Sequence, residues 1–259
     1  MKRIHLFEFE DLSWFPSILR DCMTRMLNVI HRLLKTEDTL AELMAKQLKE
    51  KPQTQIIDLC SGGGGAMPGV FLQLKEKHGF TDLRMTMTDL YPNLKAAAAI
   101  NAQGDDIQYR TLPVDATSVD TDLEGLRTMV CSFHHMPVPV ARNILKSAFD
   151  DRQDILIFEI SDNSAPFFLW WTAFPINIIT SLFISLAARP YSLQQFVFTY
   201  LIPVLPICFA WDGAVSNART YTVKDLDELL EGLQADDYVW EKGVVKGRGK
   251  MLYLRGVAK

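Results

Sequence analysis

The segment Gln55-Ile-Ile-Asp-Leu-Cys-Ser-Gly-Gly-Gly-Gly65 constrains the fold more than any other part of the chain. Residues 55–59 form a short apolar run of the kind found in strands that are covered on both faces. The four glycines allow a sharp turn and leave no side chain between the backbone and a ligand. Residues 66–77 then have the apolar spacing of a helix. The pattern predicts a strand, a glycine loop and a helix, the first unit of a nucleotide-binding α/β fold.

Further short strands with polar ends follow this unit. The predicted strand 83–89 ends in Asp89, Asp115 follows the strand 107–111, and His134 and His135 follow the strand 128–133. A carboxylate at the tip of a second strand can accept hydrogen bonds from both ribose hydroxyls of a nucleoside. Helices over 92–103 and 137–149 and a strand over 155–160 continue the alternation, which predicts a parallel sheet with right-handed crossovers.

In order and spacing, residues 53–160 resemble the class I S-adenosylmethionine-dependent methyltransferases. The resemblance rests on Asp58, the glycine loop, Asp89, Asp115 and the polar residues after the fourth strand. It implies a doubly wound, mostly parallel seven-stranded sheet with an antiparallel last strand pair, and S-adenosylmethionine as the cofactor. One position departs from the family pattern, because Cys60 stands where the family has its first loop glycine.

The resemblance also assigns a set of cofactor-binding residues. Asp58 is expected to hold the methionine amino group, Asp89 the ribose, and Asp115 with Ala116 the adenine. In open α/β sheets the ligand lies beyond the carboxyl ends of the strands, where all of these residues fall. The full set is Asp58, Cys60, Gly62, Gly64, Asp89, Leu90, Asp115, Ala116 and Phe133.

His134 and His135 are the expected catalytic residues. Methyl transfer is an in-line displacement, for which the protein must align the reacting atoms and keep water out. It can also require a base to take a proton from the nucleophile, and imidazole titrates near neutral pH. In the alternative interpretation, one histidine packs on the adenine and the other binds the backbone.

The composition limits the partners and the compartment. A net charge of −4 and an isoelectric point near 5.8 argue against nucleic acid as the main partner. The four cysteines lack CxxC spacing and the five histidines complete no metal-binding pattern. We therefore predict no metal site, and reduced thiols in the cytoplasm. Acidic residues between 8 and 11 interrupt any signal-peptide core.

Residues 1–52 precede the first strand and are predicted to form an N-terminal helical lid. Two amphipathic helices are expected, with Thr36 as the N-cap of the second. Aromatic residues near the start of the chain, Trp14 among them, suggest contact with the substrate. In the alternative interpretation, the two helices pack on the edge of the sheet.

Residues 161–212 are strongly apolar, with Arg189 as the one charge between Asp162 and Asp212. The segment separates the predicted core at 53–160 from residues 213–259, which are expected to complete the same sheet. Three interpretations stay open: a helical cap over an apolar substrate, peripheral contact with a membrane, and a homodimer interface. We favour the cap, because strands on both sides belong to one sheet. Its expected walls are aromatic: Phe167, Phe168, Trp170, Trp171, Phe174, Phe183 and Phe196.

Residues 213–259 are predicted to complete the core sheet. Thr222 and Asp225 are spaced as a variant capping box, and 238–245 with 251–257 read as a hairpin. Asp162, Arg219 and Tyr221 are polar groups next to the apolar segment. Asp162 could orient a substrate or cap a helix, and Arg219 and Tyr221 could meet the polar end of a substrate or close the cap by ion pairing. Asp212 is the expected ion-pair partner of Arg219.

The predicted function is methyl transfer to a small, largely apolar acceptor, such as a lipid-like molecule or a natural product. The first alternative is a nicotinamide-dependent oxidoreductase, which would share the strand and the glycine loop. The second is a non-catalytic protein that binds S-adenosylmethionine or associates with a membrane.

Overall fold

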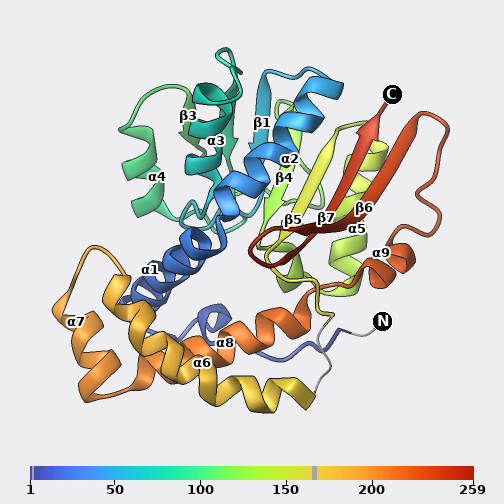
Figure 1. Cartoon of the computed structure of the whole chain (residues 1–259). Coiled ribbons are helices and arrows are strands. Elements are labelled where there is room, and N and C mark those ends of the chain that lie inside the picture. Colours follow the sequence, from blue (N-terminus) through green and yellow to red (C-terminus); the bar gives the residue numbers. More distant parts are fainter. Residues whose placement is uncertain (2, 165–167) are drawn as a thin grey trace.

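The computed structural model describes residue 1, residues 3–164 and residues 168–259, and within these all side chains except those of 168 and 170–173. A seven-stranded sheet in the order β3-β2-β1-β4-β5-β7-β6 forms its centre (Figure 1). The first five strands are parallel, and β7 is antiparallel to both β5 and β6. The predicted fold class is therefore confirmed. The strands are β1 (Gln55–Asp58), β2 (Arg84–Met87), β3 (Ile107–Tyr109), β4 (Leu126–Val130), β5 (Ile155–Glu159), β6 (Tyr238–Lys246) and β7 (Lys250–Ala258).

Helices cover both faces of the sheet. One face packs against α2 (Thr36–Glu50), α3 (Met67–Glu76) and α4 (Leu94–Asn101), and the other against α5 (Val138–Asp150) and α9 (Val223–Leu229). Alternation along β5 explains both cores, because Leu156 and Phe158 enter the first and Ile155 and Ile157 the second. The predicted capping box of Thr222 and Asp225 begins α9.

A second group of helices lies beyond the carboxyl ends of the parallel strands. It contains α1 (Ser17–Leu34), α6 (Phe168–Ala187), α7 (Leu193–Phe196), the π-helical turn Val197–Leu201 and α8 (Val204–Arg219). Figure 1 shows these helices gathered below the sheet. Leu19 and Met23 of α1 pack against Leu205 and Cys208 of α8. The boundary expected at residue 212 falls inside α8, which continues to Arg219.

The junction of α1 and α2 differs from the prediction. Lys35 links the two helices in a left-handed conformation, with φ of 54°. Thr36 is already the first residue of α2, is fully buried and contacts Nδ1 of His31 at 3.2 Å. The expectation that Thr36 is the N-cap was wrong, because one residue ends the first helix and begins the second.

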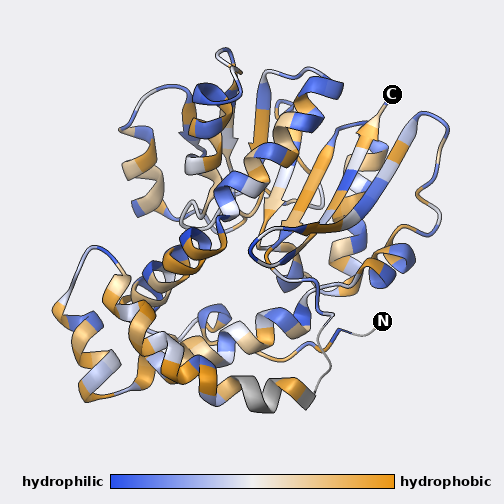
Figure 2. Ribbon diagram, in the orientation of Figure 1, coloured by the Kyte–Doolittle hydropathy of each residue, from blue (hydrophilic) through white to orange (hydrophobic). Residues whose placement is uncertain are grey.

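Much of the ribbon of the apolar segment has the colour of hydrophobic residues (Figure 2), and several of its large hydrophobic side chains are exposed. Phe183 is 68% exposed and Phe196 is 51% exposed, so neither forms the wall of an inner cavity as expected. Among the described residues, no single helix has the length and hydropathy needed to cross a bilayer; one pair, 193–201 with 204–219, meets both criteria together but is bent by 84°. Peripheral membrane contact and a homodimer interface stay predictions.

Candidate functional site

The carboxyl ends of the parallel strands bring the predicted acids and the glycine loop together. The strand order reverses between β1 and β4, and such a switch point leaves a crevice at the edge of the sheet. Gly62 donates its N–H to Oδ2 of Asp89 at 2.8 Å. Its carbonyl accepts from the hydroxyl of Tyr109 at 2.9 Å. These bonds fix the loop that follows β1 against the end of β2.

Cys60 adopts the backbone conformation that a glycine would supply. Its φ is +58°, in the left-handed region where a side chain costs roughly 1–2 kcal/mol. The loop therefore turns at Cys60 in a conformation that glycine adopts without strain. Burial raises the pKa of the Cys60 thiol to about 12, with nearby Asp89 and Asp58 adding to the effect. A thiol of this kind is a poor nucleophile.

A cavity of about 630 Å³ lies over the glycine loop. It is lined by most of the residues predicted to bind the cofactor: Asp58, Cys60, Gly62, Gly64, Asp89, Leu90, Asp115 and Ala116. Phe133 is not among the lining residues, because it is buried in the core against Tyr221. The residues next to it, Ser132 and Met136, line the cavity in its place.

The three predicted cofactor-binding carboxylates that line this larger cavity make different hydrogen bonds. Asp58 is buried and accepts hydrogen bonds from the hydroxyls of Ser61 at 2.5 Å and Thr128 at 2.8 Å. Burial raises its pKa to about 7, against the effect of those two bonds. Asp89 accepts from the N–H groups of Gly62 and Tyr91, one on each oxygen. Asp115 accepts from Thr117 through Oδ1 alone.

A second cavity, of about 330 Å³, adjoins the first. The side chains of α1 that line it are apolar, and α6 and α8 contribute both apolar and polar groups. The N-terminal segment and the chain after β4 and β5 contribute mostly polar groups. Four residues line both cavities: Glu10, Leu27, Cys131 and His135. The walls of this cavity are more polar than those expected for the predicted apolar pocket. The side chains that line it include Met23, Ile30, Ile184 and Phe209, and also Glu8, Glu159, Asn177, Thr180, Asp212 and Asn217.

His134 lies in this smaller cavity, oriented by a carboxylate that sequence analysis missed. Glu159, the last residue of β5, contacts Nδ1 of His134 at 2.8 Å and accepts its backbone N–H at 3.0 Å. A carboxylate only accepts hydrogen bonds, so Nδ1 carries the proton and Nε2 is free to accept one. Glu159 occupies the end of the fifth strand, and the rule that identified Asp89 and Asp115 could have found it.

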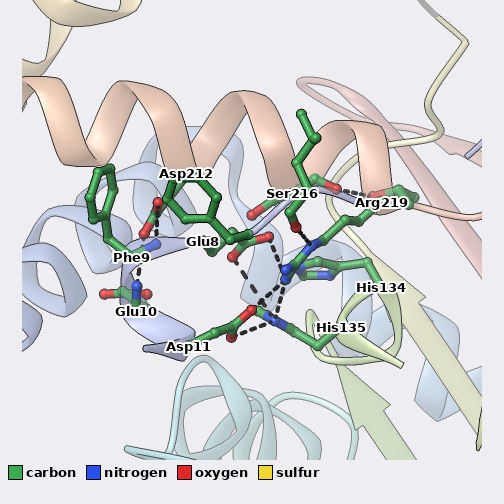
Figure 3. A network of polar contacts seen from close by, with 12 residues as sticks. Glu8, Phe9, Glu10, Asp11, His134, His135, Asp212, Ser216 and Arg219 are labelled. Atoms are coloured by element: carbon green, nitrogen blue, oxygen red, sulfur yellow. Dashed lines mark hydrogen bonds and ion pairs between the residues drawn. The ribbon is translucent and has the colours of Figure 1, made fainter. Parts of the chain in front are cut away.

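The N-terminal segment (residues 3–12) is held along α8 by side chains of that helix (Figure 3). Asp212 accepts the N–H groups of Phe9 at 2.8 Å and Glu10 at 3.1 Å. Arg219 donates from Nε to the carbonyl of Leu6 at 2.7 Å. These bonds hold the acidic residues of the segment at the wall of both cavities.

Arg219 pairs with this segment and not, as expected, with Asp212. Its Nη1 lies 3.1 Å from Glu8, 2.6 Å from Asp11 and 3.2 Å from Nδ1 of His135. The Asp212 carboxylate is instead taken up by backbone N–H groups. Arg219 is thus buried in a network of charges and lines neither cavity.

Glu8, His134 and His135 are close enough to offer ligand atoms to one metal ion, within 4.8 Å of one another. Sequence analysis predicted no metal site. The guanidinium of Arg219 already contacts two members of this group, Glu8 and His135. A cation at this place would have to displace that contact, and the donor set therefore fits a metal poorly.

The remaining predicted substrate residues lie elsewhere. Tyr221 is buried and donates its hydroxyl to the carbonyl of Met136. Trp14 is 68% exposed and lines neither cavity. Asp162 accepts the N–H of Ser164 and also lies outside both cavities. The side chains of Trp170 and Trp171 are outside the described residues.

We expect Glu10 to make the protein less stable as pH rises. Burial, then repulsion from Asp212 and Glu8, raises its pKa to about 8, while Arg20 opposes the shift. A carboxyl whose pKa is higher in the folded than in the unfolded state loses stability as pH rises from about 4.5 to about 8. The free energy of unfolding of Glu10→Gln, relative to that of the wild type, should therefore be higher at pH 8 than at pH 5 by at least about 1 kcal/mol.

Urea unfolding of both proteins at the two pH values measures this difference. Glu76→Gln, which changes an exposed residue of α3, is the matched control for the lost charge. If the free energies of unfolding of Glu10→Gln and the wild type differ by the same amount at both pH values, the Glu10 carboxyl is well solvated and the prediction is wrong.

Comparisons with known proteins support the fold. Neither a family model nor a curated protein sequence matches the chain. The plantazolicin methyltransferase BpumL, solved with S-adenosylhomocysteine, is similar in structure with a TM-score of 0.56 over 94% of this chain and 90% of that chain, at 10% identity. The methyltransferase domain of bacterial CtHen1 has a TM-score of 0.50 over 86% of this chain and 99% of that chain, at 14% identity. The chain thus has the class I methyltransferase fold.

Proposed function

We propose that the protein transfers a methyl group from S-adenosylmethionine to a small acceptor that has an apolar part. The observation that carries the proposal is the pair of adjoining cavities, with the glycine loop and its acids in the larger and His134 with Glu159 in the smaller. Both BpumL and the CtHen1 domain are described as methyltransferases. That the acceptor is small and has an apolar part is likewise proposed here.

The residues of the larger cavity fit the cofactor. Each Asp89 oxygen accepts one N–H from the protein and keeps lone-pair capacity for a ribose hydroxyl. Gly62 and Gly64 both line the cavity, and a Cβ at Gly62 would meet no atom within 4 Å, which leaves room there for a ligand. Asp115 with Ala116 would hold the adenine. When bound, S-adenosylmethionine supplies an electrophilic methyl group on a positively charged sulfur. The chain's own contribution is to align the acceptor, exclude water and take a proton through Nε2 of His134.

Cofactor identity is tested by calorimetry. S-adenosylhomocysteine should bind the purified protein, and NAD should not, because no feature of the site beyond the shared strand and loop favours a dinucleotide. Asp89→Ala is the control, because weaker binding of S-adenosylhomocysteine by this variant would show that the ligand binds in the larger cavity. Binding of NAD without binding of S-adenosylhomocysteine would overturn the methyltransferase proposal.

A further inference from the structure

Acidic side chains predominate on the polar side of the smaller cavity. Glu8, Glu10, Glu159 and Asp212 all line it, and neither lysine nor arginine does among the residues that the structure describes. A cluster of acids alone identifies no ligand, since such clusters are often neutralised within the protein. The partners of each carboxylate therefore decide what the cavity can accept.

Three of the four carboxylates have partners in the protein. Glu159 contacts the ring and the backbone of His134. Asp212 accepts two backbone N–H groups from the N-terminal segment. Glu8 forms an ion pair with Arg219 at 3.1 Å. Their charges are compensated without any ligand.

The carboxylate of Glu10 differs from these three. Its Oε1 atom is inaccessible to solvent and has no hydrogen-bond partner, which is costly for a carboxyl oxygen. Arg20, the cation that lowers the pKa of Glu10, donates to the Glu10 backbone carbonyl and not to its carboxylate. In Figure 3 the dashed line at Glu10 accordingly leaves from its backbone nitrogen, toward Asp212. Glu10 also lines both cavities, so it stands where the two ligands of a transfer reaction would meet.

We propose that the smaller cavity is a subsite for an amine, whose nitrogen is bound by Glu10 as an ammonium group and is the atom that becomes methylated. This inference rests on the proposed function and adds the chemical class of the acceptor. An ammonium group supplies both the positive charge and the N–H donors that an unpartnered carboxylate lacks. A carboxylate or phosphate would meet acidic side chains without a lysine or arginine among the described lining residues, and an alcohol brings no positive charge to stabilise the ionised form of Glu10.

The histidine of the same cavity completes the chemistry. An ammonium nitrogen has no lone pair, so it must lose a proton before it can attack. Nε2 of His134, with Nδ1 held by Glu159, is placed to accept that proton. The nitrogen then forms a bond to the methyl carbon, the bond from that carbon to sulfur breaks, and the products are the methylated amine and S-adenosylhomocysteine. The apolar side chains of α1, α6 and α8 would take up the rest of the molecule.

The test compares ligands that differ only in the polar group. Primary amines with alkyl and aryl chains of increasing length are titrated into protein saturated with S-adenosylhomocysteine, each beside the alcohol and the carboxylate of the same skeleton. We expect the wild type to bind amines at least about tenfold more tightly than the matched alcohols. Glu10→Gln should abolish this preference, whereas Glu76→Gln, with an exposed residue changed, should retain it.

Each outcome bears on one proposal. A wild type that binds S-adenosylhomocysteine but binds alcohols or carboxylates as tightly as amines overturns the amine subsite and leaves methyl transfer intact. The same holds if Glu10→Gln keeps the full preference for amines. Because the wild-type comparison is decisive by itself, the test survives a variant that fails to fold. Failure to bind S-adenosylhomocysteine at all counts against the proposed function instead, and repeating the titrations with EDTA excludes a contribution of metal ions.

Discussion

His134→Ala is expected to lower the turnover number by roughly 10²-fold or more, because a positioned general base typically contributes that much. The expectation follows from the contact of Nδ1 with Glu159, which leaves Nε2 as the proton acceptor inside the smaller cavity. The affinity for S-adenosylhomocysteine should stay nearly unchanged, since His134 does not line the larger cavity. Methylation rates under saturating substrate and calorimetry of the product complex measure the two effects.

Two further variants test whether the loss of turnover is specific to His134. Glu159→Gln keeps the size of the side chain but removes the charge that holds the imidazole, so turnover should fall and its pH profile should shift. His135→Ala should cost less turnover, because His135 is engaged with Asp11 at 3.1 Å and with Arg219. Near-full turnover in His134→Ala would mean that positioning alone drives the reaction, and a larger loss in His135→Ala would exchange the roles of the two residues.

Asp89→Ala should weaken S-adenosylhomocysteine binding by at least about tenfold. Charge-assisted hydrogen bonds contribute roughly 1.5–3 kcal/mol each before solvent is counted. The same carboxylate also accepts the N–H groups of Gly62 and Tyr91, so its loss should loosen the glycine loop as well. Calorimetry measures the affinity.

A matched variant shows whether the effect is local. Asp106→Ala removes a carboxylate that pairs with Lys75 on the exposed side of the sheet edge, far from the strand ends that form the site. It should bind S-adenosylhomocysteine like the wild type, and circular dichroism should show both variants folded. Unchanged affinity in Asp89→Ala would move the ribose site away from the end of β2.

The sequence predicted the strands and loops of the first half of the sheet because each signal there is local. A buried apolar run, a glycine loop and an acid at a strand end can each be recognised within a few residues. Parallel pairing then brings Asp58, Asp89 and Asp115 to one edge, since their strands share a direction. Cys60 could also be interpreted this way, as a family position whose left-handed backbone the structure retains.

The sequence thus determined the fold class and which polar residues follow the parallel strands, while only the tertiary structure decided what surrounds His134. Glu10 and Arg219 come from opposite ends of the chain, and no periodicity relates them to His134. Asp212 and Arg219 are seven residues apart on α8, yet they bind different groups of the N-terminal segment. Composition likewise did not reveal that Phe183 points outward and that Phe133 and Tyr221 pack together in the core. Long-range partners are chosen by how helices pack, and that choice depends on the whole of the folded chain.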